Sequence, residues 1–209
     1  MTNIYWGNCS KEAEKGNGDL KNEKLDNGVD SVEQESNHLY FYSYVSTKPV
    51  LSTVKALNDL ARNSKINAVK FGREKPDPVY LHINSCGGVI FDGLAIMDTI
   101  LNIKKEVPVY TVVEGVCASA ATFFAVVGTK RFIGQNSYYL IHQVSHIFIG
   151  SYGEFQDEQA NLDEFMVKIK NIYAKYTKVP EKELDGILKH DLYWNAQKCL
   201  EYKIIDEIL

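Results

Sequence analysis

The sequence predicts an α/β protein with a mainly parallel sheet, and three observations lead to this fold class. From His38 onward, segments patterned like strands alternate with segments patterned like helices. Turn-forming stretches such as REKPDP and SCGG separate neighbouring segments. A chain of 209 residues that is 45% hydrophobic can bury one full core. Alternation of this kind implies crossover connections between parallel strands of one sheet.

The first half of the ordered chain contains two predicted strands and two predicted helices. HLYFYSYV, at 38–45, reads as a buried strand, and VYLHIN, at 79–84, reads as a second one. Between them a helix is expected over 49–63, and another helix is expected after SCGG. The apolar face of the first is Val50, Val54, Leu57 and Leu60 or Ala61; that of the second is Ile90, Leu94, Met97 or Ile96, and Ile100 or Leu101.

The second half begins with a strand over 107–113 that runs into a helix over 119–128. Two short strands, RFIG and YYLIH, follow, and then a long helical pattern over 154–177. Apolar residues recur there at three- and four-residue steps: Leu162, Phe165, Met166, Ile169, Ile172, Tyr173 and Tyr176. This stripe is long for a helix that covers one small sheet, so two interpretations stay open: part of the helix packs on another subunit, or it is a long core helix.

The N-terminal segment differs in composition from the rest of the chain. Residues 7–37 are poor in large apolar residues and rich in Lys, Glu, Asp, Asn and Gly. Such a segment buries too little surface to offset the entropy lost on ordering. We therefore expect a flexible tail over 1–36 and one domain over 37–209.

Composition also bounds the partners and the compartment. The net charge is −4, and the chain lacks a basic cluster, which argues against nucleic acid as the main partner. No apolar run is long enough to span a bilayer, and the first residues lack the pattern of a secretory signal, so we expect no membrane contact and a cytoplasmic or cytosol-like compartment. The four cysteines lack zinc-ligand spacing and are interpreted as reduced thiols.

The window VEGVCASAATFFAVVG, at 113–128, places Ser119 among alanines, where a larger side chain would bury more surface. On this window alone we prefer a helix cap, because serine commonly accepts a hydrogen bond from the first turn of a helix. The alternative is a nucleophile at a strand-to-helix turn, where small neighbours leave room for a substrate. Serine catalysis needs a base, a group that orients the base, and backbone donors for the oxyanion.

Candidates for these further roles are present. His142 ends the strand YYLIH, at the edge where parallel sheets gather active sites, whereas His146 lies in the next loop. A single histidine at a strand end is more often a structural residue than a base. The glycine pair of INSCGG follows a strand and precedes a helix, so its N–H groups could face an anionic oxygen, although turns need glycine in any case.

Four motifs in order resemble the ClpP family, the proteolytic subunits of the Clp protease. INSCGGVIFDGLAIMDTI is similar to the family's I-N-S-P-G-G segment and its following helix. GVCASAATFFAVVG is similar to its serine segment, RFIGQNSYYLIHQ to its histidine segment, and DLYWNAQKCLEYKIIDEIL to its C-terminal ending. The resemblance runs from about Val79 to Leu209.

The resemblance implies the ClpP/crotonase fold with a protruding handle helix, and it implies a serine endopeptidase without metal or cofactor. Ser119 would be the nucleophile, His142 the base and Asp191 the carboxylate that orients it. Without the resemblance Asp191 reads as a helix N-terminal residue, and nothing favours it over Asp185 or Asp206. The N–H groups of Gly88 and Ala120 would form the oxyanion hole, and Gly87 and Val144 would contact substrate.

The resemblance also implies unfolded or partly unfolded polypeptide substrates, a homo- or hetero-oligomeric ring with stacked heptamers, and a Clp-type AAA+ ATPase partner. Two departures bear on specificity: Cys86 replaces the family's proline, and Val144, Ser145 and His146 replace a segment rich in proline and glycine. Two alternatives are kept, a non-catalytic ring subunit and a related phage head-maturation protease. Cys117 is judged an improbable nucleophile because it lies two residues from the turn.

Overall fold

One twisted sheet organises the protein, and the computed structural model describes it over residues 31–145 and 147–209. Within these residues the strand order is β1-β2-β3-β4-β5-β8, and β6 pairs with β4 and β7. The strands are β1 (Ser31–Glu35), β2 (His38–Tyr42), β3 (Val79–Ser85), β4 (Val109–Ala118), β5 (Lys130–Ile133), β6 (Tyr138–Leu140), β7 (Trp194–Asn195) and β8 (Glu207–Ile208). The pairings from β2 to β8 and that of β4 with β6 are parallel, which confirms the predicted mainly parallel α/β class.

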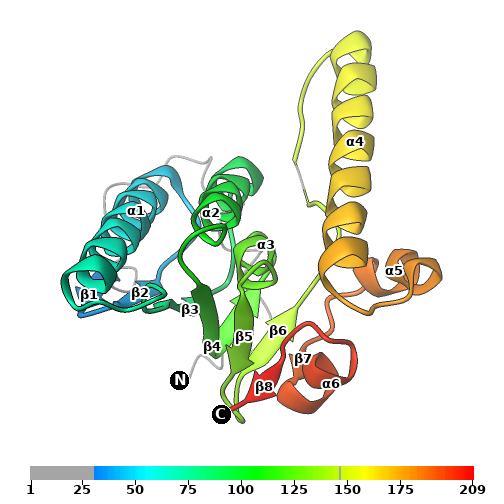
Figure 1. Ribbon diagram of the computed structural model, residues 1–209. Helices are drawn as coiled ribbons and strands as arrows, with labels where there is room; N and C mark the ends of the chain where they lie inside the picture. The colour runs from blue at the N-terminus through cyan, green and yellow to red at the C-terminus, as the bar shows by residue number, and fades with distance from the viewer. Residues whose placement is uncertain (1–30, 146) are drawn as a thin grey trace, which may run out of the picture.

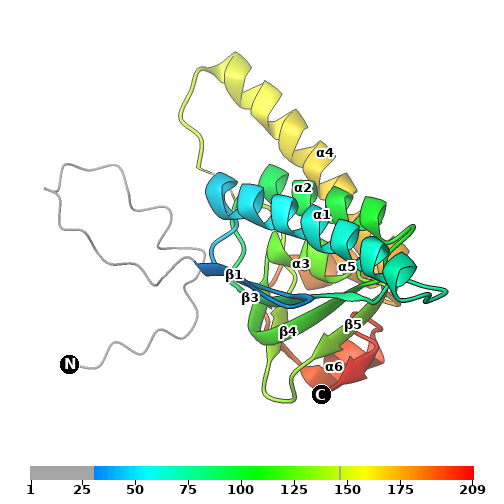
Figure 2. The same ribbon diagram turned by 60° about the vertical axis from the view of Figure 1, so that its left-hand side comes forward.

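Helices cover the sheet and enclose the core. They are α1 (Thr47–Lys70), α2 (Ile90–Ile103), α3 (Ala121–Ala125), α4 (Tyr152–Tyr176), α5 (Glu181–Leu188) and α6 (Ala196–Glu201). In Figures 1 and 2, α1, α2 and α3 lie over one face of the sheet. The core forms beneath them from alternate residues of β3, such as Leu81 and Ile83, and from apolar helix residues such as Leu57 and Ile96, all of which are fully buried.

Helix α1 continues well beyond the predicted end at residue 63, because small residues extend its buried face. Ser64 and Ala68 are both buried, and the Ser64 hydroxyl donates to the carbonyl of Asp77 at 2.6 Å. A search for large apolar residues does not detect a face made of serine and alanine. The helix gives way to a turn at Gly72, whose φ of +62° favours glycine.

The apolar run over 113–128 divides differently from the prediction, with a longer strand and a much shorter helix. Strand β4 continues to Ala118 because β6 pairs with its last residues, from Val116 to Ala118. Gly115, with a φ of +76°, lies where the pairing with β3 shifts register. Helix α3 then begins only at Ala121. The end of the strand and the helix are both largely apolar and mostly buried, so periodicity could not separate them.

The predicted boundary of the tail at residue 36 lies too far along the chain. Residues 31–35 form β1, which pairs antiparallel with β2, and Val32 packs against the core. The composition is polar because an edge strand is held largely by backbone hydrogen bonds, for which side-chain polarity matters little. The rest of the predicted tail, residues 1–30, lies outside the described residues.

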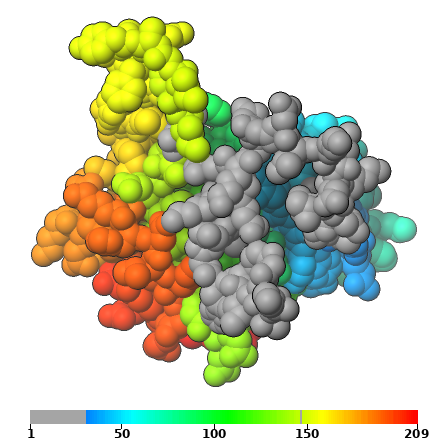
Figure 3. Space-filling model, turned by 180° about the vertical axis from the view of Figure 1, so that it is seen from behind, coloured from blue at the N-terminus to red at the C-terminus, as the bar shows by residue number. Residues whose placement is uncertain are grey.

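Helix α4 projects from the body of the molecule, as Figures 1 and 3 show. Its buried residues are Ile169, Ile172 and Tyr173, all near its C-terminal end. Towards its N-terminal end, Tyr152 is 78% exposed and Phe155 is 57% exposed. The base of the helix therefore belongs to the core, as one interpretation of the stripe held, while the projecting half leaves its apolar side chains uncovered by the described residues.

The cysteines do not all behave as expected. Cys117 and Cys199 are free and buried, in agreement with reduced thiols. Cys86 is disulfide-bonded, so the prediction of a reduced thiol is wrong there, and the residue is only partly buried. Cys9 lies outside the described residues. None of the helices in the described ranges combines the length and the apolar character needed to cross a bilayer.

Candidate active site

Ser119 lies in a strained turn between the end of β4 and the start of α3. Its φ is +54°, a left-handed conformation that is uncommon for any residue other than glycine. Its N–H donates to the carbonyl of Leu140 at 3.0 Å, which fastens the turn to β6. The N-cap of α3 is Ala120, and no side chain caps the helix. The helix-cap interpretation of Ser119 is therefore wrong, and the turn presents the serine at the sheet edge instead.

The glycine pair after β3 is packed directly against this turn. A Cβ atom on Gly87, whose φ is +94°, would lie 2.5 Å from Ser119 Cβ. A Cβ atom on Gly88, whose φ is +149°, would lie 2.2 Å from the carbonyl oxygen of Val45. Two hydrogen bonds of 2.8 Å to Val45, one accepted by the Gly87 carbonyl and one donated by Val89 N–H, hold the glycines in place. Only glycine fits this close approach at both positions.

The parallel register of β6 with β4 brings His142 towards Ser119. Leu140 pairs with Ala118, so His142 follows β6 at the level where Ser119 follows β4. Gln143 N–H donates to the carbonyl of Leu188 at 2.7 Å, and this bond joins the segment to the end of α5. The loop after α5 carries Asp191 to His142, with 3.2 Å between Asp191 Oδ1 and His142 Nδ1.

The hydrogen-bonding groups that catalysis would use have no partner among the described residues. Because Nδ1 of His142 faces Asp191, its Nε2 is the nitrogen available to a hydroxyl. Within the described part of the chain, the Ser119 hydroxyl makes no hydrogen bond to His142, and the N–H groups of Gly88 and Ala120 pair with no acceptor. Catalytic hydrogen bonds are often long before substrate binds, and unpaired N–H groups beside a serine can serve an oxyanion.

The two residues expected to contact substrate differ in what they offer. The N–H of Val144 donates to the sulfur of Met166 on α4, at 3.4 Å, and could exchange that weak acceptor for a peptide carbonyl. The N–H of Gly87 already donates to the hydroxyl of Ser85 at 3.1 Å. Its carbonyl already accepts from Val45 N–H, so both backbone groups of Gly87 are paired and the residue is suited to close packing. Met166 had been assigned to the apolar stripe alone, and no sequence spacing indicates its contact with Val144.

Other groups that can titrate take no part in this arrangement. His38 Nδ1 and His82 Nε2 are 2.8 Å apart, and His82 also bonds Glu114, so both belong to a polar network on the sheet face. Burial raises the pKa of the Cys117 thiol well above its ordinary value, which leaves the thiol neutral and unreactive. His146 lies outside the described residues, and across the described ranges no cluster of His, Cys, Asp and Glu is arranged to hold a metal ion.

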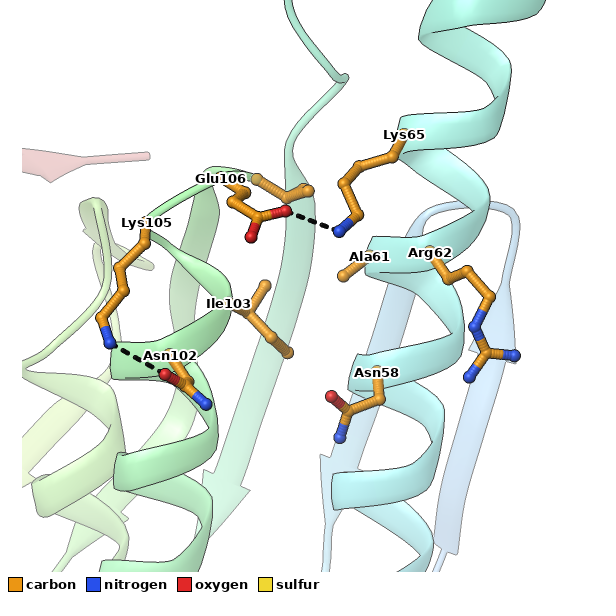
Figure 4. A pocket seen from close by; sticks show the side chains of 9 residues that line it. Asn58, Ala61, Arg62, Lys65, Asn102, Ile103, Lys105 and Glu106 are labelled. Atoms are coloured by element: carbon orange, nitrogen blue, oxygen red, sulfur yellow. Dashed lines mark hydrogen bonds and ion pairs between the residues drawn. The ribbon is translucent and has the colours of Figure 1, made fainter.

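A groove of about 510 Å³ between α1 and α2 is separate from these residues. Its lining is mostly polar and includes Arg62, Lys65 and Lys105. Figure 4 shows Lys65 and Lys105, each paired with a neighbouring side chain. Lys65 bonds Glu106 at 2.6 Å, and Lys105 bonds Asn102 at 2.9 Å. Both lysines of the groove therefore already have a partner.

A serine at a strained strand-to-helix turn, beside a histidine that faces a carboxylate, is the arrangement of a serine hydrolase. The family model described as Clp protease matches residues 34–209, and the chain belongs to this family. Membership confirms the family inferred from the four sequence motifs, and it makes the protein a serine peptidase of the Clp class.

Similar proteins agree with this assignment. An ATP-dependent Clp protease proteolytic subunit of Dehalococcoides mccartyi is 34% identical over 80% of this chain and 85% of its own length. One from Streptococcus thermophilus is 33% identical over 80% of this chain and 88% of its own. The solved structure of a ClpP1 variant from Listeria monocytogenes matches 83% of this chain and 91% of its own chain, with a TM-score of 0.71. Its sequence identity is 23%, so the match confirms the fold.

Proposed function

We propose that Ser119, His142 and Asp191 form the catalytic triad with which this chain hydrolyses peptide bonds. The observation that carries the proposal is the 3.2 Å contact between His142 and Asp191 at the level of the strained Ser119 turn. Asp185 and Asp206 are the alternatives that sequence left open, and each has another partner. Asp185 bonds Lys170 at 2.5 Å, and Asp206 bonds Arg131 at 2.7 Å.

In the proposed reaction, Ser119 Oγ attacks the carbonyl carbon of the scissile bond while His142 Nε2 takes its proton. Asp191 holds the imidazole through Nδ1 and stabilises the imidazolium that forms. The Gly88 and Ala120 N–H groups receive the oxyanion. His142 then gives the proton to the leaving amine, and the acyl group stays on Ser119 Oγ as an ester. His142 next takes a proton from a water molecule that attacks this ester, and it returns the proton to Ser119 Oγ as the carboxylic acid is released.

The substrate lies between the Gly87–Gly88 turn and Val144 in this proposal. An extended peptide can add its backbone as a strand only if its own hydrogen bonds are free, which restricts the substrates to unfolded or partly unfolded polypeptides. Val144 N–H must leave Met166 to pair with the peptide, and the weak sulfur acceptor makes this exchange easy.

We further propose that the chain works in a ring, with heptamers stacked through the projecting half of α4. The exposed side chains there, Tyr152 and Phe155 together with Ile149 before the helix, form the kind of apolar surface that marks an interface. The relatives are named as subunits of an ATP-dependent protease, which supports a Clp-type ATPase as partner. The proposed compartment is the cytoplasm.

A fluorophosphonate probe tests the proposed triad. We expect the probe to label the wild-type protein and not Ser119→Ala, and Ser119→Ala or His142→Ala to lose several orders of magnitude in peptidase rate. His146→Ala is the control and should stay active. Absence of labelling in the folded wild type would favour the non-catalytic ring subunit, and cleavage of a single capsid protein while unfolded chains are spared would favour the maturation protease.

A further inference from the structure

A buried hydrogen-bond network lies directly behind the turn that carries Ser119. The hydroxyl of Thr122, on α3, is 2.5 Å from the carbonyl oxygen of Ser119. The hydroxyl of Tyr173, near the C-terminal end of α4, is 2.5 Å from the Thr122 hydroxyl. Thr122 is 0% exposed and Tyr173 is 1% exposed, so water cannot replace either bond. Thr122 belongs to the serine segment and Tyr173 to the apolar stripe of the long helix, but neither pattern indicates that their side chains meet.

The direction of these bonds follows from the number of protons. The Thr122 hydroxyl has one proton, and a carbonyl oxygen can only accept, so Thr122 donates to Ser119. Tyr173 must then donate to Thr122. Burial raises the pKa of Tyr173 far above its ordinary value, which keeps its hydroxyl protonated and able to donate at any working pH. The two bonds therefore form a chain from α4 through α3 to the serine.

The carbonyl of Ser119 matters because it shares a peptide unit with the N–H of Ala120. The unit is planar and trans, as all peptide bonds of the described residues are, so the C=O and the N–H point in opposite directions. The Ser119 carbonyl is held by two donors, the Thr122 hydroxyl and the Thr122 N–H at 3.0 Å. Fixing the carbonyl on the buried side fixes where the Ala120 N–H points on the open side.

We propose that Thr122 and Tyr173 are positioning residues that aim the Ala120 N–H at the oxyanion. The proposal rests on the proposed function, in which that N–H is one of the two oxyanion donors. It also connects the base of the projecting helix to the nucleophile through two hydrogen bonds. Tyr173, a buried residue of α4, bonds Thr122, and Thr122 bonds Ser119. The N–H would tilt if either hydroxyl were lost, and a donor out of line stabilises the transition state less.

The test compares three variants with a matched control. Tyr173→Phe and Thr122→Val each remove one hydroxyl, and Thr122→Ser keeps it. The control is Tyr139→Phe: Tyr139 is also 1% exposed and also donates to a carbonyl of α3, that of Thr122 at 3.0 Å, but it does not touch the Ser119–Ala120 peptide unit. Tyr139→Phe thus reproduces the loss of a buried tyrosine hydroxyl without disturbing the proposed donor.

We expect kcat, per site titrated with fluorophosphonate, to fall roughly 10- to 100-fold in Thr122→Val and about 10-fold in Tyr173→Phe, with KM nearly unchanged. The affinity for a peptide aldehyde, which forms an oxyanion on reaction with serine, should fall by the same factor. Thr122→Ser should stay within about threefold of wild type, and so should Tyr139→Phe. Because Tyr173 acts through Thr122, adding Tyr173→Phe to Thr122→Val should lower kcat no further.

Two failures can be told apart. If Thr122→Val and Tyr173→Phe lowered the melting temperature yet kept wild-type kcat per titrated site and aldehyde affinity, the positioning role would be refuted while an inactive Ser119→Ala would still support the triad. Additive losses in the double variant would likewise refute the chain of two bonds. If Ser119→Ala kept its activity, the proposed function itself would fail.

Discussion

The two halves of the candidate site are built differently. The serine half, made of Gly87, Gly88 and Ser119, is held by backbone hydrogen bonds and by packing without space for a Cβ atom on either glycine. The histidine half, made of His142 and Asp191, depends on one contact of 3.2 Å, and the Asp191 side chain is 63% exposed. The first half is part of the core, whereas the second combines a largely buried histidine with a carboxylate on an exposed loop.

Because they are built differently, the two halves should respond differently to mutation. A change in the serine half disturbs contacts that also stabilise the fold. A change at Asp191 in the histidine half alters a mostly exposed carboxylate, which contributes little to stability in a single chain but orients the base. Loss of activity with loss of stability should therefore mark the first half, and loss of activity alone should mark the second.

The largest combined effect is expected for Gly87→Ala. The added Cβ would lie 2.5 Å from Ser119 Cβ and 2.6 Å from the Ala118 carbonyl oxygen, at a φ of +94°. Peptidase activity should fall more than about 100-fold, and the free energy of unfolding should fall by roughly 2–4 kcal/mol. Denaturant unfolding and peptide hydrolysis measure the two effects. Gly186→Ala on α5, where a Cβ meets open space, is the control: it should keep its activity and should not lower the free energy of unfolding, because alanine is favoured over glycine within a helix.

Asp191→Asn should have a large effect on activity alone. The amide keeps the shape of the side chain but cannot hold the imidazole in the tautomer that accepts a proton, and kcat should fall roughly 10²- to 10⁴-fold. The free energy of unfolding should stay within about 0.5 kcal/mol of wild type, because the carboxylate is mostly exposed. A variant that unfolded as easily as Gly87→Ala would show that the histidine half is not separable from the core.

The projecting half of α4 gives an intermediate effect. Phe155→Glu places a charge on a side chain that is 57% exposed, so it should lower the native mass and reduce activity about 10-fold without weakening the fold of the single chain. Ile169→Glu is a less specific test of assembly, because Ile169 is 3% exposed and lies in the core. Sedimentation of a fully active wild-type monomer would overturn the proposed link between assembly and activity.

The smallest effect concerns the polar network of His38, His82 and Glu114, away from both halves of the site. The pKa of His38 is lowered, chiefly by burial and then by His82, although Glu35 and Glu114 oppose the shift. The folded state therefore binds this proton less readily than the unfolded state. Stability should be full above the ordinary histidine pKa and should decrease as the pH falls below it towards the lowered value.

Substituting His38 tests this sign. His38→Gln should make the free energy of unfolding less dependent on pH between about pH 7 and pH 5. The pH dependence of kcat should not change, because the network has no contact with Ser119 or His142 among the described residues. If the free energy of unfolding of the variant depended on pH as steeply as that of the wild type, His38 would not be the cause of this dependence.

Sequence alone could predict the order of strands and helices from β2 to α4, because alternating apolar segments and turn residues are local features. It gave no prediction for the short elements α5, β7, α6 and β8. It could not detect β1, whose main stabilising contacts are backbone hydrogen bonds to β2. Nor could it divide the run over 113–128 into strand and helix, since both parts are largely apolar and mostly buried. These errors share a cause: what decides each boundary is a pairing with a distant part of the chain.

The candidate site shows the same limit. Ser119 and His142 lie next to strand ends that the pattern predicts, but Asp191 was chosen by resemblance alone. Its separation from Asp185 and Asp206 depends on salt bridges formed by the fold, those with Lys170 and Arg131. The link between Thr122 and Tyr173 joins residues 51 positions apart, and no local pattern indicates it.

The projecting α4 can also be considered as a mechanical lever. At about 1.5 Å per residue, its tip lies roughly 30 Å from Tyr173, the residue that bonds Thr122 behind the nucleophile. If the buried base acts as the pivot, a displacement of a few ångströms at the tip becomes a movement of only a few tenths of an ångström at the base. Hydrogen-bond alignment changes on that smaller scale, so a helix of this length turns coarse movements between neighbouring molecules into fine adjustment of a reacting group.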